Sequence, residues 1–368
     1  MKKVLVVIQL LRRGGVELAA LNFAKALSKE KYAVTLLLVN PDEAQDKELE
    51  QEVKAQGFEI VKIPKYCNSY LKKYKFISEL MSRNGFYAVH SHVLFFSGIV
   101  MLAAKKNGIK KRLCHSHLSK WNRKEGVAFK LYKNAMRFLI NSFATDRLAC
   151  SYEAGCFLYG KGKYEKNGVF IANAIDTEKY SFNEEARDRI RSEFSVSDDE
   201  VLVGHIGTIY RIKNQVFLTE VLAEMQKRNA DVKLLLVGEE LEREAVEEKA
   251  KSLGVAERII FAGQRSNINE ILQAMDIMIF PSLFEGLPIS LIEAQASSLP
   301  CLVSDAVTQD VKFNDNVEFM SLNESAEKWA EKAFEMLNES RKAVSTEKLR
   351  KSYDISACAK RLDEILLS

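Results

Sequence analysis

Residues 277–304 read IMIFPSLFEGLPISLIEAQASSLPCLVS, and this stretch decides the fold class of the chain. Its first four residues form an apolar run that predicts a buried strand, which Pro281 ends. A loop follows, and Pro288 falls where the first turn of a helix is expected, a position at which proline is tolerated because its missing N–H would be unpaired anyway. The helix is expected to end near Ser298, and a second apolar run predicts the next strand.

The start of this helix carries the first indication of a function. No Ser, Thr, Asp or Asn directly precedes Pro288 to cap the helix, so its first N–H groups are free to bind a group outside the chain. A helix N-terminus is a ready site for a phosphate. Glu285 and Glu293 flank it, and such carboxylates bind hydroxyl groups. The combination indicates a nucleotide-sugar site.

Composition limits the class of protein. The 368 residues are enough for about two domains, and 47% hydrophobic with 28% charged residues is typical of a soluble globular protein. Residues 1–9 are too short for the apolar core of a signal peptide and predict a first buried strand. The six cysteines are scattered without a C-x-x-C pair, which favours reduced thiols in a cytoplasm.

The net charge of +4 hides an asymmetry. Residues 1–170 hold 30 Lys and Arg against 14 Asp and Glu, whereas residues 171–368 hold 24 against 36. Residues 60–140 alone hold 17 basic and 2 acidic residues, interleaved with aromatic side chains such as Trp121. Such a field attracts anionic partners, and the mixture suits a membrane surface, although a solvated face is the ordinary explanation.

Strand and helix patterns alternate along the whole chain. They begin with a strand at residues 4–8, continue to 168–172, and restart with a strand at 201–206. This alternation predicts two doubly wound parallel sheets, with binding sites at the carboxyl ends of their strands. Two such domains joined near residues 173–176 are expected to leave a cleft, which is a usual place for a ligand.

Three motifs in this order carry a resemblance to a known family: GGVE at 14–17, IGTIYRIKNQ at 206–215 and FEGLPISLIEAQASSLPCLVSD at 284–305. The chain resembles the retaining GT-B-fold glycosyltransferases of family four, whose signature is E-x7-E, and among them hexosyltransferases of bacterial capsular and exopolysaccharide assembly. The resemblance implies an N-terminal, acceptor-side Rossmann-like domain at 1–172. A donor-binding domain is implied at 173–352, with a last helix at 353–368 that packs back onto the first domain.

The resemblance also assigns the site residues. Those implied to act in catalysis are His117, Glu285 and Lys213, with His115 as the alternative to His117. Those implied to bind substrate are Gly14, Gly15, Arg211, Arg265, Gly286, Leu287, Pro288, Ile289, Ser290 and Glu293. Left-handed turns would explain the two N-terminal glycines equally well, and a surface loop would explain Arg265.

This sequence departs from the family pattern at two places. Thr208 stands where the family has an arginine on the donor diphosphate, and we expect Arg211 to replace it. Glu239 follows Gly238 where a second glycine is common. The chain contains no D-x-D, so Lys213, glycine loops and helix dipoles are expected to stabilise the leaving diphosphate without a metal.

Four of the five histidines form two H-x-H pairs, His90 with His92 and His115 with His117. Residues two apart on a strand share a face, so two such pairs could bind a metal. The resemblance instead places one histidine near the donor sugar. We therefore expect neither a metal nor a cofactor here.

The resulting hypothesis is a metal-independent retaining transferase. It moves a hexosyl unit from a nucleotide diphosphate sugar, UDP-linked, to a lipid-linked or oligosaccharide acceptor, at the inner face of the cell membrane. A sugar-nucleotide epimerase on the same fold and a non-catalytic sugar-nucleotide binder or scaffold are the alternatives. Nucleic-acid binding is not expected, because no binding motif accompanies the basic charge.

Overall fold

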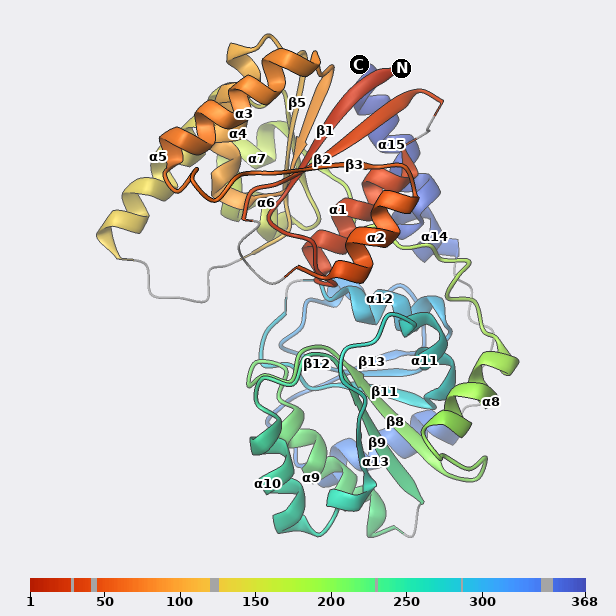
Figure 1. The fold of residues 1–368 in the computed structure, drawn as a ribbon. Coiled ribbons are helices and arrows are strands. Elements are labelled where there is room, and N and C mark those ends of the chain that lie inside the picture. The colour runs from red at the N-terminus through yellow and green to blue at the C-terminus, as the bar shows by residue number, and fades with distance from the viewer. Residues whose placement is uncertain (28–29, 41–44, 120–125, 229–230, 286, 339–346) are drawn as a thin grey trace. The chain divides into compact units, whose positions relative to one another are not determined.

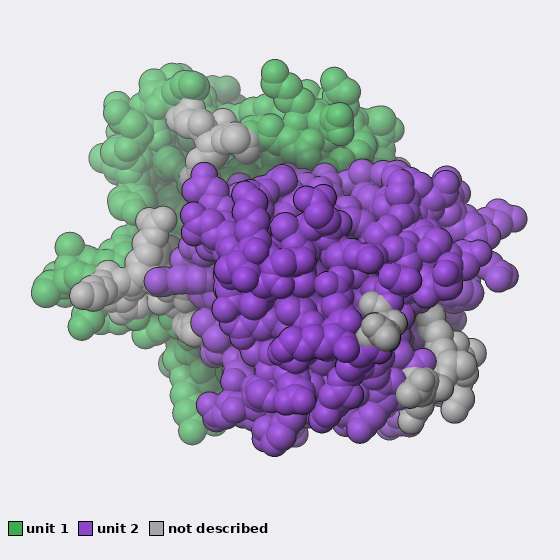
Figure 2. All heavy atoms as spheres, turned by 90° about the horizontal axis from the view of Figure 1, so that it is seen from below, with its two compact units in different colours: residues 1–175, 352–368 green, residues 176–351 purple. Residues whose placement is uncertain are grey.

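The structure is a computed structural model that describes residues 1–27, 30–40, 45–119, 126–228, 231–285, 287–338 and 347–368. The chain divides into two compact units, which Figure 2 colours separately. Unit 1 comprises residues 1–175 and 352–368, and unit 2 comprises residues 176–351.

Unit 1 contains a parallel sheet of seven strands in the order β3-β2-β1-β4-β5-β6-β7 (Figure 1). Its strands are β1 (Lys2–Ile8), β2 (Tyr32–Leu38), β3 (Glu59–Lys62), β4 (Ala88–Ser91), β5 (Lys111–Ser116), β6 (Asp146–Ala149) and β7 (Gly168–Phe170). The strand order reverses between β1 and β4, as in doubly wound folds, where ligands bind at such a switch point. This confirms the predicted fold of the first half.

Helices cover both faces of this sheet (Figure 1). They are α1 (Gly15–Ala26), α2 (Lys47–Ala55), α3 (Tyr70–Asn84), η1 (Leu94–Phe96), α4 (Ser97–Lys106), α5 (Val127–Phe143), α6 (Tyr152–Tyr159), α7 (Lys161–Asn167) and, from the end of the chain, α15 (Ile355–Leu367). The last helix packs against α1. Asp363 on α15 accepts a 2.5 Å hydrogen bond from the Tyr32 hydroxyl and lies 2.9 Å from Lys31 Nζ, so the final residues belong to the first unit.

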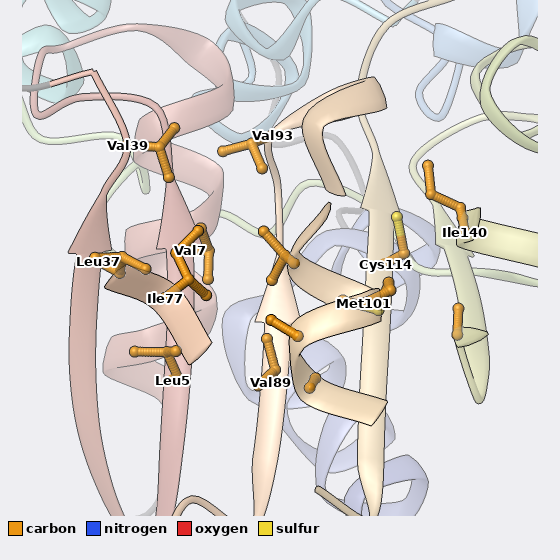
Figure 3. Close-up of a cluster of buried hydrophobic side chains, with 14 of the residues drawn as sticks. Leu5, Val7, Leu37, Val39, Ile77, Val89, Val93, Met101, Cys114 and Ile140 are labelled. Carbon is orange, nitrogen blue, oxygen red and sulfur yellow. The ribbon is translucent and has the colours of Figure 1, made fainter. Parts of the chain in front are cut away.

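One core layer of unit 1 lies between the sheet and helices α3 to α6. Side chains that alternate along the strands, such as Leu5 and Val7 of β1, meet apolar side chains of the helices, such as Ile77 of α3 and Met101 of α4 (Figure 3). All four are fully or almost fully buried. A buried aliphatic side chain contributes about 1.5–3 kcal/mol to folding, so this layer fixes the sheet on which the histidine pairs lie.

Unit 2 contains a second parallel sheet, of six strands, in the order β10-β9-β8-β11-β12-β13. Its strands are β8 (Val201–Ile206), β9 (Val232–Val237), β10 (Ile259–Phe261), β11 (Ile277–Phe280), β12 (Cys301–Ser304) and β13 (Val317–Met320). The order reverses between β8 and β11, so these two strands are neighbours although about seventy residues separate them in sequence. Two doubly wound parallel α/β units, as predicted, are thereby confirmed.

The helices of unit 2 and of the chain's end are α8 (Glu184–Glu193), α9 (Gln215–Gln226), α10 (Arg243–Leu253), η2 (Ala256–Arg258), α11 (Ile268–Ala274), α12 (Ile289–Ala296), η3 (Gln309–Val311), α13 (Ala326–Asn338) and α14 (Glu347–Tyr353). The sequence patterns did not predict α3, α7, α8, α11 or β13. The pattern of α8 is dominated by charge, and its position depends on distant partners. Arg187 and Arg191 of α8 donate to Asp276, at 2.6 and 3.1 Å respectively. Asp276 follows the end of α11. Among the described residues no helix is both long and apolar enough to cross a membrane.

Candidate active site

The loop between β11 and α12 has the geometry that the sequence indicated. Pro288 is the N-cap of α12, with φ −71° and ψ 118°, one residue before the position expected for it. No side chain among the described residues caps the helix. Because the first N–H groups of a helix lack intrahelical partners, Ile289 and Ser290 begin a turn that suits an anionic ligand. Leu287, half-buried, precedes this turn, and Gly286 lies outside the described residues.

Lys213 and Glu285 form an ion pair at the carboxyl edge of the unit 2 sheet. Lys213 Nζ lies 2.7 Å from Glu285 Oε1, and each side chain is about one-fifth exposed. The ammonium group also lies 4.9 Å from the centre of the Phe280 ring. The loop after β8 supplies the lysine and the loop after β11 supplies the glutamate. The two residues assigned to catalysis in this unit are therefore in direct contact.

Backbone contacts hold these two loops together. The Leu283 N–H donates to the Ile212 carbonyl at 2.8 Å, and the Asn214 side-chain amide donates to the Pro281 carbonyl at 3.2 Å. Asn214 has φ +58°, which asparagine tolerates better than most residues. The Lys213–Glu285 pair consequently stands on a fixed support, as a pre-organised binding group requires.

Glu293 lies on α12 and is held by a residue that sequence analysis missed. The Tyr180 hydroxyl donates to Glu293 Oε1 at 2.7 Å. Burial raises the pKa of the Glu293 carboxyl above its usual value, although the tyrosine hydrogen bond opposes this shift. Tyr180 follows the end of unit 1 in a stretch without a family motif, and no signal in the sequence identifies it as a partner of Glu293. Because Tyr180 contacts Oε1 of Glu293, the second carboxylate oxygen, Oε2, is available for a ligand hydroxyl.

The two arginines assigned to the donor differ in their surroundings. Arg211 is exposed, its backbone N–H donates to Glu242 at 2.6 Å, and it lies in the same loop as Lys213. Arg265 points to α8 instead: its guanidinium pairs with Glu193 at 2.5 Å and lies 5.6 Å from the Phe194 ring centre. The structure thus gives Arg265 a structural partner, whereas Arg211 is accessible to solvent.

Three glycine loops approach one another beside this site. Gly238, after β9, has φ +148°, and a Cβ there would lie 2.3 Å from the Gly207 carbonyl oxygen, after β8. The Gly238 N–H donates to the Gly263 carbonyl at 2.9 Å. Close packing of three loops over the strand ends therefore depends on glycine at position 238.

Gly238→Ala is expected to destabilise the protein by about 2 kcal/mol, because the new Cβ overlaps the Gly207 backbone and the φ angle is strained for alanine. Thermal unfolding measures the change. Gly162→Ala on α7 is the matched control, since a Cβ at Gly162 meets nothing within 4 Å. Equal melting temperatures for the two variants would contradict the close approach of the loops.

In unit 1, Gly14 and Gly15 form the start of α1. Gly14 is its N-cap with φ −99°, so the alternative of left-handed turns is wrong for Gly14. Gly15 is the first helical residue and is not among the residues with positive φ. A Cβ at Gly14 would lie 2.6 Å from a carboxylate oxygen of the buried Glu17, whereas Gly15 is open. Space for Glu17 explains the first glycine.

Four histidines gather where β4 and β5 end. His90 pairs with Leu113 in the sheet register. Because alternate residues of a strand share a face, His92, His115 and His117 project from the same face as His90. Phe23 of α1 packs on this group, with 5.2 Å between its ring centre and that of His115. His90, His92 and His115 are at most 5% exposed.

Hydrogen-bond contacts connect these rings in pairs. His92 Nδ1 lies 2.8 Å from His117 Nε2, and His117 Nδ1 lies 2.8 Å from Asn173 Oδ1. His90 Nε2 lies 3.3 Å from His115 Nδ1. Burial lowers the pKa of His90 to about 3 and that of His117 to about 4, so the rings are neutral near pH 7. Both ring nitrogens of His117, the histidine assigned to the donor, are thus already in contact with protein atoms.

Comparison with known proteins identifies the family of the chain. Residues 13–179 match the family described as Glycosyltransferase Family 4, and residues 200–339 match Glycosyl transferases group 1. The chain is 32% identical to glycosyltransferase EpsF of Bacillus subtilis (strain 168) over 90% of this chain and 86% of that protein. It is 24% identical to the capsular polysaccharide biosynthesis glycosyltransferase CapH of Staphylococcus aureus, over 100% and 99% of the two chains.

Solved structures share the architecture. Anabaena HepE in complex with UDP and glucose superposes with a TM-score of 0.79 over the whole of both chains, at 18% identity. The fold and the sequence matches define a GT-B glycosyltransferase. The chain belongs to the family 4, or group 1, glycosyltransferases.

Proposed function

We propose that this glycosyltransferase moves a hexosyl unit from a UDP-sugar to a lipid-linked or oligosaccharide acceptor during assembly of a cell-surface polysaccharide, with retention of the anomeric configuration. The Lys213–Glu285 pair beside the uncapped start of α12 is the observation that carries the proposal. CapH supports the polysaccharide context, because it is named for capsular polysaccharide biosynthesis. HepE supports the donor, because it was solved with UDP and glucose.

Unit 2 offers complementary groups to the diphosphate, the ribose and the sugar of such a donor. The lysine ammonium and the N-terminus of α12 supply positive charge for a diphosphate. Glu293, with one oxygen held by Tyr180, offers the other to ribose hydroxyls, and Glu285 offers a carboxylate to the sugar or the phosphate. Arg211, on the same loop as Lys213, replaces the arginine that the family has at position 208. Binding of the diphosphate would draw Lys213 from Glu285 toward the phosphate.

The transfer step then needs no nucleophile from the protein. The bond from the anomeric carbon to the diphosphate oxygen breaks, and the acceptor oxygen bonds to the same face of the sugar. The acceptor proton passes to the departing phosphate. Lys213 and the helix dipole stabilise the charge that develops on the leaving group, in place of a divalent metal. His117, which the resemblance assigns to the donor sugar, would have to exchange its contact with His92 or Asn173 for a sugar hydroxyl.

A thermal-shift panel of UDP, GDP and their hexose conjugates tests the donor assignment, because a ligand that binds only the folded state stabilises it according to its occupancy. We expect stabilisation by UDP and by at least one UDP-hexose. Turnover with a lipid-linked acceptor in EDTA, followed by determination of the product anomer, tests retention and independence from metal. No stabilisation by any nucleotide would overturn the proposal.

A non-catalytic sugar-nucleotide binder is the second candidate. Thr208 in place of arginine and the mutual neutralisation of Lys213 and Glu285 both favour it. Stabilisation by UDP-hexose without transfer to any acceptor would support this reading. Free UDP together with an epimerised sugar, formed without acceptor, would instead indicate an epimerase.

Unit 1 also carries a surface that suits contact with an anionic membrane. Tyr70 of α3 stacks on Tyr132 of α5, with 5.3 Å between ring centres, and joins the two helices. Large exposed apolar side chains on and next to these helices are Tyr66, Tyr70, Leu71, Val127, Leu131 and Phe138. Exposed lysines such as Lys72, Lys75 and Lys130 accompany them. Apolar side chains insert at the interface while lysines attract anionic headgroups, which supports peripheral attachment to the inner face of the cell membrane.

The double variant Leu131→Ser, Phe138→Ser is expected to weaken binding to phosphatidylglycerol vesicles about 10-fold or more, because two exposed apolar side chains no longer enter the interface. Vesicle co-sedimentation at low salt measures it, and high salt should weaken the wild type as well. Leu241→Ser is the matched control, since Leu241 is also exposed but belongs to unit 2. Equal binding by the double variant and the control would contradict the assignment.

A further inference from the structure

The histidine group of unit 1 contains nitrogen atoms for which the proposed function has no use. One ring nitrogen from each of His90, His92 and His115 lies within 4.8 Å of the other two. Within the described residues, this is the one group of three or more such side chains with ligand atoms so close together. A zinc ion with Zn–N bonds of about 2.0–2.1 Å needs its nitrogens roughly 3.3 Å apart, so small ring movements would complete the geometry.

The hydrogen bonds fix which nitrogen of His92 is free. Asn173 Oδ1 accepts only, so the nitrogen of His117 that faces it, Nδ1, carries the proton. In a neutral ring His117 Nε2 is then unprotonated and accepts a hydrogen bond, so His92 Nδ1 must carry a proton and donate to it. The other ring nitrogen of His92, Nε2, is consequently unprotonated and carries a lone pair. It is buried and has no hydrogen-bond partner among the described residues.

His115 Nε2 carries a lone pair in the tautomer whose Nδ1–H donates to His90 Nε2, and His90 Nε2 would exchange this hydrogen bond for the ion. His115 Nε2 is buried without a hydrogen-bond partner in the part of the chain that the structure describes, while Nδ1 of the same ring contacts His90. A buried polar atom without a partner costs about 1–3 kcal/mol, which a ligand atom at this position would offset. His92 donates to His117, and His117 donates to Asn173. Metal-bound histidines are held in this way, because their second ring nitrogen donates to a fixed acceptor.

We propose that His90, His92 and His115 bind a divalent transition-metal ion of the zinc class. The ion joins the ends of β4 and β5, and His117 with Asn173 orients His92 toward it. Three protein nitrogens leave one position for water in a tetrahedral shell. The site belongs to unit 1, whereas the groups proposed to bind the diphosphate belong to unit 2, so this ion site is an addition to the proposed function. The sequence alone led us to expect no metal at these pairs.

Zinc titration of the full chain, purified and stripped with a chelator, tests this proposal without any sugar nucleotide. We expect one Zn²⁺ per chain by calorimetry and a higher melting temperature in its presence, because an ion that binds the folded state stabilises it. His92→Gln and His115→Gln should each weaken zinc affinity by at least 10-fold. His117→Gln should weaken it by about 10- to 100-fold, because it removes the hydrogen bond behind His92.

Two controls make the result decisive. His205→Gln alters the buried histidine of unit 2 and should leave zinc affinity unchanged. Substitution of Co²⁺ should give the visible bands of nitrogen coordination without thiolate charge transfer, which excludes binding by cysteines. Should a ligand variant fail to fold, the Co²⁺ spectrum of the wild type decides. Absence of binding, or binding that the three histidine variants leave intact, would overturn the proposal.

Discussion

Lys213→Met is expected to lower the rate of sugar transfer about 100- to 1,000-fold, the loss found when one pre-organised donor to a developing negative charge is removed. The lysine is the cation paired with Glu285 at the edge of the sheet, and its loop is fixed to the loop after β11 by two hydrogen bonds. Methionine keeps an apolar stem against Phe280 and removes the charge. Release of UDP from a UDP-hexose in the presence of acceptor measures kcat.

The matched control is Lys227→Met. Lys227 also forms a 2.7 Å ion pair, with Glu224, in the same unit, but it is two-thirds exposed and lies at the far end of α9. Its activity should equal that of the wild type. A Lys213→Met enzyme with unchanged kcat would remove the lysine from the mechanism.

Glu285→Gln separates two roles of the pair. If Glu285 contacts the donor, the variant binds UDP-hexose more weakly while its affinity for UDP changes less. If the carboxylate only neutralises Lys213, the variant binds UDP more tightly, because the ammonium no longer has to leave a partner.

Glu293→Gln is expected to raise the melting temperature at neutral pH and to weaken donor binding about 10- to 150-fold. Hydrogen bonds to a charged group contribute about 1.5–3 kcal/mol, which sets the size of the affinity loss. Glutamine keeps an oxygen that accepts from Tyr180 and removes the buried charge. A gain in stability with a loss of function is typical of residues selected for binding.

The direction of the stability change in Glu293→Gln follows from the pKa of the Glu293 carboxyl. Burial raises the folded-state pKa of Glu293 above the value of 4.5 for a free glutamate. A carboxyl group whose pKa is raised by folding stabilises the folded state at pH values below its unfolded-state pKa. This contribution is lost as the pH rises through the folded-state pKa. The stability gain of Glu293→Gln should therefore be absent at low pH and grow above about pH 4.5. Thermal unfolding from pH 4 to 8 measures it.

Tyr180→Phe is the companion variant. It leaves the carboxylate buried without its hydroxyl donor, so it should lower stability near pH 7, opposite to Glu293→Gln. Donor affinity should fall less than in Glu293→Gln, because both carboxylate oxygens are retained. A Glu293→Gln protein that is less stable than the wild type at pH 7 would show that the carboxylate is not an unfavourable buried charge.

The sequence by itself determined the fold class and the place in the sheet of the groups proposed to bind the donor. Apolar runs separated by helical patterns required parallel sheets, and parallel strands end at the same edge. Lys213 and Glu285 follow two of those strands, so both had to lie at the carboxyl edge. Pro288 and the absence of a capping residue indicated an open helix start, because these are properties of the local backbone.

Only the tertiary structure reveals which residues far apart in sequence contact each other. Tyr180 reaches Glu293 across 113 residues, and Arg265 turns to Glu193 on a helix that no local pattern revealed. The histidine pairs met because the register of β4 against β5 set His90 opposite Leu113. A shift of one residue would have sent one pair to the opposite face of the sheet. Register and helix packing are sums over many non-local contacts, so no short motif encodes them.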